Sequence, residues 1–570
     1  MIRVFLYLAW RSTYNRVARQ ARQLRNPRYL AALAFGLTYL WIVAVDQRPE
    51  HPPQMLVGAR WLELVGAIGV IGALLWGWIF GVERRVLAFS PAEVTFLFSG
   101  PVTRRGLVQY KLLRNQVLIL FNSLLWTLIL ARERFGASPW LRALSIWVLL
   151  TTISFHRLGA SFVRTSLLEH GRIALRHRVV SLVLLGALVI GVAWSIKDAM
   201  PDLAAGWAGG LTTFLDALTE ASERPVPHLL LAPFRAMVRP LAARTLGDWL
   251  RAAGPAVGLL VLHYVWVIRA DAAFEEASAE AALQRARLSS RERASPRLAH
   301  RRLPALLRLA PVGWPAQAIL WKNLLAVVRT RRARNVAGAL TVAAIVAGML
   351  SFQAQSSIAE VAGWLAATWA GLAIVIGPQW VRNDLRSDLL KLDLLRSYPL
   401  AGRAVVAAET AASTMVLTAL QAGLLLVAYF AFLGNGDMDP PLGLRTIALL
   451  TALACLPGIN YLGMLIQNGA AILLPAWVHL GSGRPGGVEA LGQNMLIIVA
   501  YSAVLAVGLA FPGVLGLLVF YLLGDDIGWW AVIPGVAVLL TGLAIEAAVL
   551  LGWLGRVFEA TDPAGADIPA

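Results

Sequence analysis

The stretch VVAAETAASTMVLTALQAGLLLVAYFAFL, residues 405–433, contains a single charged side chain, that of Glu409. A helix rises about 1.5 Å per residue, so a run of this length is long enough to cross the ~30 Å hydrocarbon core of a bilayer. Backbone polar groups in hydrocarbon must be paired within the segment, which favours an α-helix. The stretch therefore predicts a membrane-spanning helix, and similar runs recur along the chain.

The composition supports the same class of protein. The 570 residues are 58% hydrophobic, and the mean hydropathy is +0.66, whereas soluble domains are about 45–50% apolar. The 21 tryptophans suit anchoring at the membrane interface. In a soluble protein the net charge of +19 would suggest nucleic acid. Here the arginines flank apolar runs and set topology, so we expect membrane lipids and no nucleic acid as partners.

The apolar runs predict an all-α, polytopic membrane protein with about twelve spans. Their approximate bounds are 29–46, 61–82, 112–130, 141–156, 178–194, 250–268, 336–352, 363–380, 405–433, 446–466, 494–511 and 529–554. With the N-terminus in the cytoplasm, most of the 51 Lys and Arg residues fall on the cytoplasmic side. The stretch Gly513–Leu523 suggests an additional half-helix that enters from the outer side.

Two pairs of matching sequences indicate an internal duplication. Trp10-Arg11-Ser12 precedes the first span as Trp321-Lys322-Asn323 precedes the seventh. Phe98-Ser99-Gly100-Pro101 follows the second span as Arg396-Ser397-Tyr398-Pro399 follows the eighth. Each unit then has a leading amphipathic interfacial helix and six spans. Because six is even, both units insert in the same orientation, as a parallel repeat.

The duplication divides the chain into three parts. We expect a first six-span half at 1–268, a cytoplasmic linker at 269–313 and a second six-span half at 314–570. The linker begins with an Ala- and Glu-rich stretch and continues with many arginines and three prolines. This composition is typical of a solvated connection.

A short capped helix is predicted between the second and third spans. Ser90 and Glu93 form a capping box around Pro91, which suits the first helical position because no backbone N–H is needed there. Gly100 and Pro101 end the helix. At about nine residues the helix is ~13 Å long, too short to span the bilayer, so it lies along the cytoplasmic surface.

The second half contains a counterpart at 385–396. Leu385, Leu389 and Leu392 share one helical face, and Pro399 follows the helix as Pro101 follows the first one. One interpretation is a pair of interfacial helices that rest on lipid headgroups. The other, which the duplication favours, is a pair of docking elements for a soluble protein with two-fold symmetry.

These features resemble the permease subunits of ABC-2-type exporters, in particular the bacterial family named "Putative ABC exporter". The resemblance rests on Ser90–Lys111, on Asp384–Glu409 with Tyr398-Pro399-Leu400, on the six-span unit, and on Phe274-Glu275-Glu276-Ala277. It implies a permease in the bacterial inner membrane, and the chain departs from the family pattern because it fuses two six-span halves. It also implies coupling helices, at about 90–98 and 385–396, that dock separate ATP-binding subunits.

The same resemblance implies which residues contact those subunits. Apolar side chains would fill a cleft of the ATPase, and charged ones would orient docking at its rim. The residues expected in these roles are Glu93, Phe96, Phe98, Pro101, Arg104 and Arg105 in the first loop and Asp388, Leu395, Pro399 and Arg403 in the second. For the arginines, topology and headgroup contact are the alternative role.

The sequence contains no P-loop, which requires Gly-Lys-Ser/Thr. The lysines are Lys111, Lys197, Lys322 and Lys391, and none of them follows a glycine. We therefore expect that the chain is not an enzyme and holds no cofactor, and that a partner subunit uses ATP.

Other candidate sites are few. Glu546 is the deepest acidic residue in a span and is a candidate for the transport pathway, whereas Glu63 and Glu409 lie near span ends. His156, His170 and His177 lack a zincin-type spacing, and Cys455 stands alone in an apolar run. We expect neither a metal site nor a disulfide.

Two other function classes are alternatives. A secondary, ion-coupled transporter of major-facilitator type also has twelve spans in two parallel halves. Its compact Gly- and Arg-rich loop between the second and third spans is missing here, and acidic residues in mid-span are scarce. An intramembrane lipid enzyme would need clustered His or acidic residues at one membrane face. The residues leave open whether a lipid, peptide, drug or polysaccharide is transported, and whether one chain or two form the transporter.

Overall fold

The computed structural model contains helices and their connections in the ranges that it describes. These ranges, with small gaps and scattered single positions elsewhere, are 59–80, 104–129, 138–169, 197–208, 211–269, 312–328, 331–351, 356–432, 442–475 and 491–561. They include no strand. The all-α fold class is therefore confirmed.

Six stretches of the described residues are helical, long and apolar enough to cross a membrane. They are Pro139–Ala160, Leu246–Arg269, Ala359–Asp388, Gly402–Ala431, Leu442–Leu473 and Ile497–Ala560. The third extends past the long helix that ends at Trp380 into a short one, and the last contains two long helices. Shorter apolar stretches lie at Glu63–Leu74, Leu112–Leu128, Gln317–Val328 and Leu340–Met349. The protein is thus a polytopic membrane protein. The predicted spans at 29–46 and 178–194, and most of the leading helix at 1–28, lie outside the described residues.

The chain divides into two compact units. Unit 1 comprises Met1–Arg25, Leu40–His300 and Gly486–Asn494, and unit 2 comprises Asn26–Tyr39, Arg301–Pro485 and Met495–Ala570. The predicted linker at 269–313 falls almost entirely outside the described residues, so its bounds stay a prediction.

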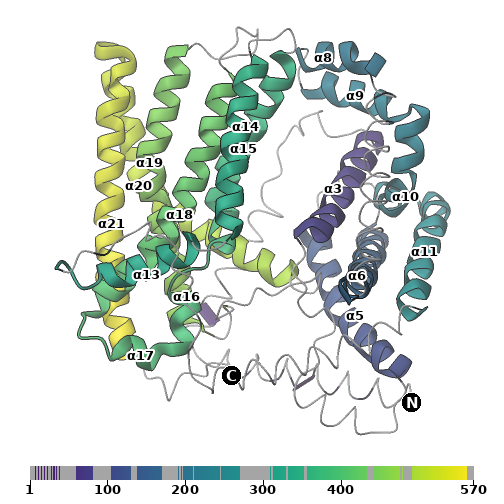
Figure 1. Ribbon diagram of the computed structural model, residues 1–570, viewed down its shortest axis with the longest axis horizontal. Helices are drawn as coiled ribbons and strands as arrows, with labels where there is room; N and C mark the ends of the chain where they lie inside the picture. The colour runs from purple at the N-terminus through teal and green to yellow at the C-terminus, as the bar shows by residue number, and fades with distance from the viewer. Residues whose placement is uncertain are drawn as a thin grey trace. The chain divides into compact units, whose positions relative to one another are not determined.

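Unit 1 is a helical bundle around α6 (Pro139–Glu169). This helix contacts α3 (Ala59–Phe80), α5 (Arg104–Ile129), α10 (Pro225–Ala242) and α11 (Leu246–Arg269). Two short helices, α8 (Met200–Ala208) and α9 (Leu211–Ser222), precede α10 (Figure 1). The core between α3 and α10 is formed by Val70, Leu74, Met237 and Val238.

A buried arginine holds the start of α10. Arg235 is 4% exposed, and its Nη1 donates to Glu223 Oε1 at 2.9 Å while its Nη2 donates to Ser222 Oγ at 2.5 Å. Burial by itself raises the pKa of Glu223, but the hydrogen bond and charge of Arg235 lower that pKa below its ordinary value. Further along α10, Arg239 Nε lies 3.1 Å from Glu63 Oε2. Glu63, predicted near a span end, thus joins α3 to α10.

Unit 2 is built around α18 (Gly402–Ala431). Figure 1 shows α18 beside the helices that it contacts, and these are α13 (Gln317–Val328), α14 (Arg331–Ser351), α15 (Ser356–Trp380), α19 (Leu442–Leu473) and α21 (Val532–Ala560). The apolar run that begins at Val405 thus lies in the central helix of this unit.

The helix α20 (Leu491–Ile527) continues through Pro512 without a break. The half-helix suggested at Gly513–Leu523 is therefore not formed, because these residues extend α20. Gly528, which follows, has a φ of +59°, a conformation that glycine adopts without steric cost. The chain turns there through the 3₁₀ helix η6 (Gly528–Ala531) into α21.

Between α15 and α18 the chain forms three short helical pieces. They are α16 (Leu385–Asp388), the 3₁₀ helix η4 (Leu389–Lys391) and α17 (Leu392–Arg396). Figure 1 shows α16 and α17 near one end of the long helices of unit 2. Residues 384–400, which contain these pieces, are called the 384–400 segment below.

Candidate functional site

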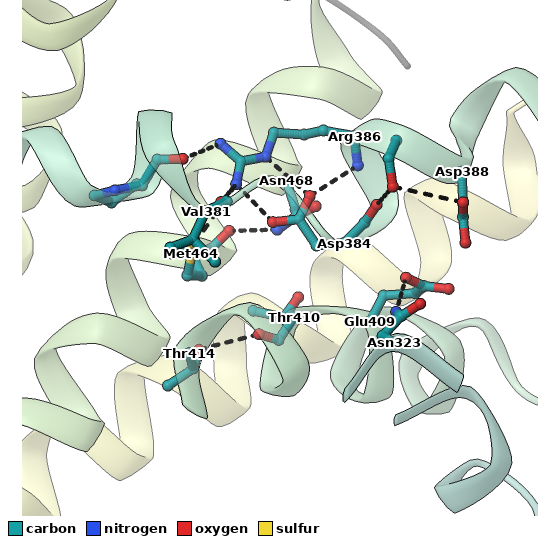
Figure 2. A network of polar contacts seen from close by, with 12 residues as sticks. Asn323, Val381, Asp384, Arg386, Asp388, Glu409, Thr410, Thr414, Met464 and Asn468 are labelled. Carbon is teal, nitrogen blue, oxygen red and sulfur yellow. Dashed lines mark hydrogen bonds and ion pairs between the residues drawn. The ribbon is translucent and has the colours of Figure 1, made fainter. Parts of the chain in front are cut away.

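The 384–400 segment begins with a capped turn. Asp384 is the N-cap of α16, and its Oδ1 accepts from the backbone N–H of Arg386 at 3.1 Å. The Arg386 guanidinium also donates to both carboxylate oxygens, from Nε to Oδ1 at 2.9 Å and from Nη2 to Oδ2 at 2.6 Å (Figure 2). Both side chains are buried. A two-point ion pair has a fixed geometry, so it sets the direction in which the segment leaves α15.

Arg386 also binds the segment to two long helices. Its Nη1 donates to the carbonyl of Pro378 and its Nη2 to that of Val381, each at 2.7 Å. These carbonyls lie at the end of α15, where intrahelical partners run out and a positive charge is favourable. Nη2 also lies 3.7 Å from Met464 Sδ on α19. One buried side chain thus connects the segment with α15 and α19.

One face of the segment is buried in an apolar core. Four of the leucines of the segment lie on this face, each at most 4% exposed: Leu385, Leu389, Leu392 and Leu395. Their core contains residues of α18, α19 and α21, namely Val405, Val406, Leu465, Leu554 and Phe558. Burying a leucine side chain contributes roughly 1.5–3 kcal/mol. The leucines therefore fix the segment to three helices at once.

A charged cluster joins the segment to α13 and α18. Lys322 Nζ donates to Asp388 and lies 3.4 Å from Oε1 of the buried Glu409, whose Oε2 accepts from Asn323 Nδ2 at 2.6 Å. Burial by itself lowers the pKa of Lys322, but the hydrogen bond to Asp388 and the charge of Glu409 raise that pKa above its ordinary value. Lys322 therefore stays positively charged between two carboxylates.

The far end of the segment is joined to the end of α21. Arg396 donates from Nη1 to Thr561 O at 2.6 Å and from Nη2 to Glu559 O at 2.7 Å. The guanidinium thus caps the last carbonyls of α21. The Glu559 carboxylate in turn accepts from the backbone N–H of Gly402, at the start of α18, at 2.5 Å. The segment, α18 and α21 are therefore linked at one end of unit 2.

The helices α18 and α21 make backbone contact at this end. A Cβ on Gly402 would lie 2.5 Å from Gly555 O, and a Cβ on Gly555 would lie 2.6 Å from the backbone N of Arg403. Such distances are shorter than van der Waals contact, so the helices approach closely only because both positions are glycine.

The opposite face of the segment is exposed. Leu394 and Tyr398 are 53% and 40% exposed, and Lys391, Asp393 and Pro399 are exposed near them. Apolar and aromatic side chains surrounded by charged ones are typical of a protein interface with an apolar centre and a polar rim.

Of the four predicted docking residues of the second loop, two are exposed and two are held by contacts within the chain. Pro399 and Arg403 are exposed, as a contact with a partner requires. Leu395 instead lies in the apolar core, and Asp388 pairs with Lys322. A helical pattern shows that a face is apolar, but not whether the chain itself covers that face. Leu394, next in sequence to Leu395, takes the outward position.

Four of the six predicted docking residues of the first loop, Glu93, Phe96, Phe98 and Pro101, lie outside the described residues. Arg104 and Arg105 form the first turn of α5. The role of this loop stays a prediction.

Sequence reasoning missed the contacts that hold the segment. The pair of Asp384 and Arg386 has a weak local signal, namely an acidic residue at an N-cap position two residues before an arginine. The contacts of Arg396 with α21 and of Lys322 with Glu409 join residues far apart in the sequence. No local pattern predicts them.

Among the other candidates from the sequence, Glu546 in unit 2 and His156 in unit 1 belong to the described residues, whereas His170 and His177 do not. Glu546 lies on α21 facing α20, its Oε2 3.8 Å from where a Cβ on Gly508 would be. In unit 1, His156 Nδ1 lies 3.2 Å from His263 Nε2, and both rings line a cavity of about 300 Å³. Among the described residues, no group of three or more His, Cys, Asp or Glu side chains could hold a metal ion.

Comparison with known proteins relates nearly the whole chain to a family of transporters. The family model described as "Putative ABC exporter" matches residues 2–551. No curated protein and no solved structure gives a significant match. The matched range includes the 384–400 segment and the long helices of both units except the last turns of α21.

Proposed function

The chain belongs to the ABC exporter family, and from this premise we propose that it is the membrane-spanning permease of an ATP-driven exporter. Family membership and the helical membrane architecture support a transport role. The 384–400 segment then docks a separate ATP-binding subunit, and the predicted helix at 90–98 provides a second docking element. On this proposal the segment lies in the cytoplasm, and the chain resides in a bacterial inner membrane with a cytoplasmic N-terminus.

The observation that carries the proposal is that the segment is anchored on one face and exposed on the other. Its leucines and arginines bind it to α15, α18, α19 and α21, and Lys322 adds α13. Closely packed contacts resist deformation, so a displacement at one of them is passed on to its neighbours. A partner that moves the exposed face therefore acts on the ends of all these helices.

This arrangement suits a permease that is driven by a separate ATP-binding subunit. Binding and hydrolysis of ATP change the shape of the partner, and the segment conveys that change to the spans. The partner shifts the permease between two states only if it binds one of them more tightly. The exposed residues of the segment are where that difference in affinity arises.

The substitution Leu394→Glu tests the docking role. A charge in the apolar centre of the interface is expected to reduce copurification of an ATP-binding subunit at least about tenfold, the loss that 1.4 kcal/mol produces. The chain is purified from detergent-solubilised native membranes, and the partner is identified by its P-loop sequence and ATPase activity. Val312→Glu, which changes an exposed apolar residue before α13, is the matched control and should leave copurification unchanged.

The outcome against the proposal is equally specific. If no ATP-binding subunit copurifies with the unaltered chain, and collapse of the proton gradient stops transport, the protein is a secondary transporter. If copurification is intact in Leu394→Glu, the segment is not the docking element.

A further inference from the structure

A stripe of polar side chains is buried between α18 and α19. On α18 the polar positions recur at three- or four-residue spacing, which keeps them on one helical face. Each member is at most 7% exposed, and the members, called the polar stripe, are Thr410, Ser413, Thr414, Gln421, Asn460 and Asn468. Both helices are apolar spans, so a buried stripe of this kind needs a physical reason.

Part of the stripe holds helices together. Asn460 Nδ2 donates to Gln421 Oε1 at 2.6 Å and to Thr418 Oγ1 at 2.9 Å. Gln421 Nε2 donates to the carbonyl of Ala370 on α15 at 3.0 Å. Hydrogen bonds between spans contribute about 1 kcal/mol each to helix association. Association alone therefore accounts for Gln421 and for the amide nitrogen of Asn460.

Most of the other polar atoms of the stripe are paired within their own helices: the hydroxyls of Thr410 and Thr414 and Nδ2 of Asn468 each donate to the carbonyl four residues earlier. Three atoms are not: Ser413 Oγ, Asn460 Oδ1 and Asn468 Oδ1 are buried and have no hydrogen-bond partner in the structure. Leaving a buried polar atom unpaired costs roughly 1–3 kcal/mol. That cost disappears when water or a polar group of a ligand reaches the atom. Three such atoms along one stripe indicate that polar molecules reach it at some stage of the working cycle.

The stripe begins at the 384–400 segment. Figure 2 shows the Asn468 side chain beside the pair of Asp384 and Arg386, and Thr410 directly follows Glu409. From Thr410 to Gln421 the stripe rises about 17 Å along α18, at about 1.5 Å per residue. It thus extends from the docking end of unit 2 into the middle of a ~30 Å hydrocarbon core.

The chemistry of the stripe is neutral. There is no charged residue in α18 from Thr410 onward, nor in α19 from Thr446 onward. The stripe offers hydroxyl and amide groups, which exchange hydrogen bonds with hydroxyls, amides and water. It offers no countercharge to an ion crossing a low-dielectric region, where an unpaired charge is costly.

We propose that the polar stripe lines the transport path of unit 2 and binds water and the uncharged hydroxyl or amide groups of the transported compound. The inference rests on the proposed function. The segment contacts both α18 and α19, through its leucines and through Arg386. Its displacement therefore changes the contact between these two helices and admits polar molecules to the stripe.

Cysteine labelling tests this inference, because Cys455 is the only cysteine in the chain. In a Cys455→Ala background, Ser413→Cys places a thiol on the stripe, and Met415→Cys places one at nearly the same depth on the side that is 51% exposed. Native membranes that contain the chain and its ATP-binding subunit are treated with a small, uncharged methanethiosulfonate that carries a hydroxyl group, with and without ATP. Thiols react as thiolates, which form in water and not in hydrocarbon. We expect Ser413→Cys to react at least about tenfold faster than Met415→Cys when ATP is present.

The other outcomes are distinct. If Ser413→Cys reacts no faster than Met415→Cys in any condition, the inference is overturned even where the ATP-binding subunit copurifies. If Ser413→Cys reacts faster with no effect of ATP, the polar path stands and the ATP-driven function loses support. Asn460→Cys repeats the comparison from α19 if Ser413→Cys does not accumulate.

Discussion

At the scale of single residues, Arg386 determines how the 384–400 segment is held. Its guanidinium is the partner of the buried Asp384 carboxylate and of two carbonyls at the end of α15. Removing one member of a buried pair is far more costly than the net value of the pair, because the other charge stays buried without compensation. Arg386 is thus a positioning residue, which acts by holding the segment and not by touching a partner.

Arg386→Met should therefore destabilise unit 2 by roughly 3–5 kcal/mol, the range for breaking a buried ion pair. The measurement is the thermal unfolding midpoint of the purified chain in detergent. Lys391→Met, a change to an exposed residue of the same segment, is the control and should leave the midpoint within error. Equal midpoints for the two variants would show that the pair of Asp384 and Arg386 does not hold the segment.

At the scale of elements, the sequence predicts long apolar helices better than short ones. The helices α18 and α19 follow from hydropathy because no other structure satisfies so long a run of backbone groups in a membrane. The sequence suggested a half-helix at Gly513–Leu523, yet α20 continues through Pro512, since tertiary packing overrides a weak local signal. Residues 385–396 are helical as predicted, although in three short pieces, and the sequence did not show that Leu395 is buried, because its burial depends on helices far away in sequence.

The close contact between α18 and α21 predicts that an added methyl group between these helices lowers stability. In Gly555→Ala the added methyl would lie 2.6 Å from Arg403 N and 2.8 Å from Arg403 Cα, so the helices must separate. We expect a loss of about 1–3 kcal/mol, typical of overpacking, seen as a lower unfolding midpoint. Gly552→Ala, three residues earlier on α21 with open space around its Cβ position, is the matched control. A Gly555→Ala protein as stable as Gly552→Ala would mean that the close approach is not needed.

At the scale of the whole molecule, contacts within unit 2 show which helix ends lie on the same side as the 384–400 segment and which lie on the opposite side. The ends of α15, α19 and α21 and the start of α18 meet at the 384–400 segment. The turn at Gly528–Ala531 precedes α21 and therefore lies at the other end of that helix. It carries two exposed tryptophans, Trp529 and Trp530, a residue type that is enriched at membrane interfaces. Ser397 of the segment and Trp530 thus belong on opposite sides of the membrane.

Labelling from each side of the membrane tests this topology and the predicted parallel repeat together. In a Cys455→Ala background, Trp530→Cys should react with an impermeant maleimide on intact cells, and Ser397→Cys only in inverted vesicles. The parallel repeat predicts that Ser99→Cys, in the first loop, behaves like Ser397→Cys, because an even number of spans separates the two loops. Reaction of Ser99→Cys on intact cells would place the two loops on opposite sides. A single pair of cytoplasmic ATP-binding subunits then has no way to contact both, and only the 384–400 segment is left to dock one.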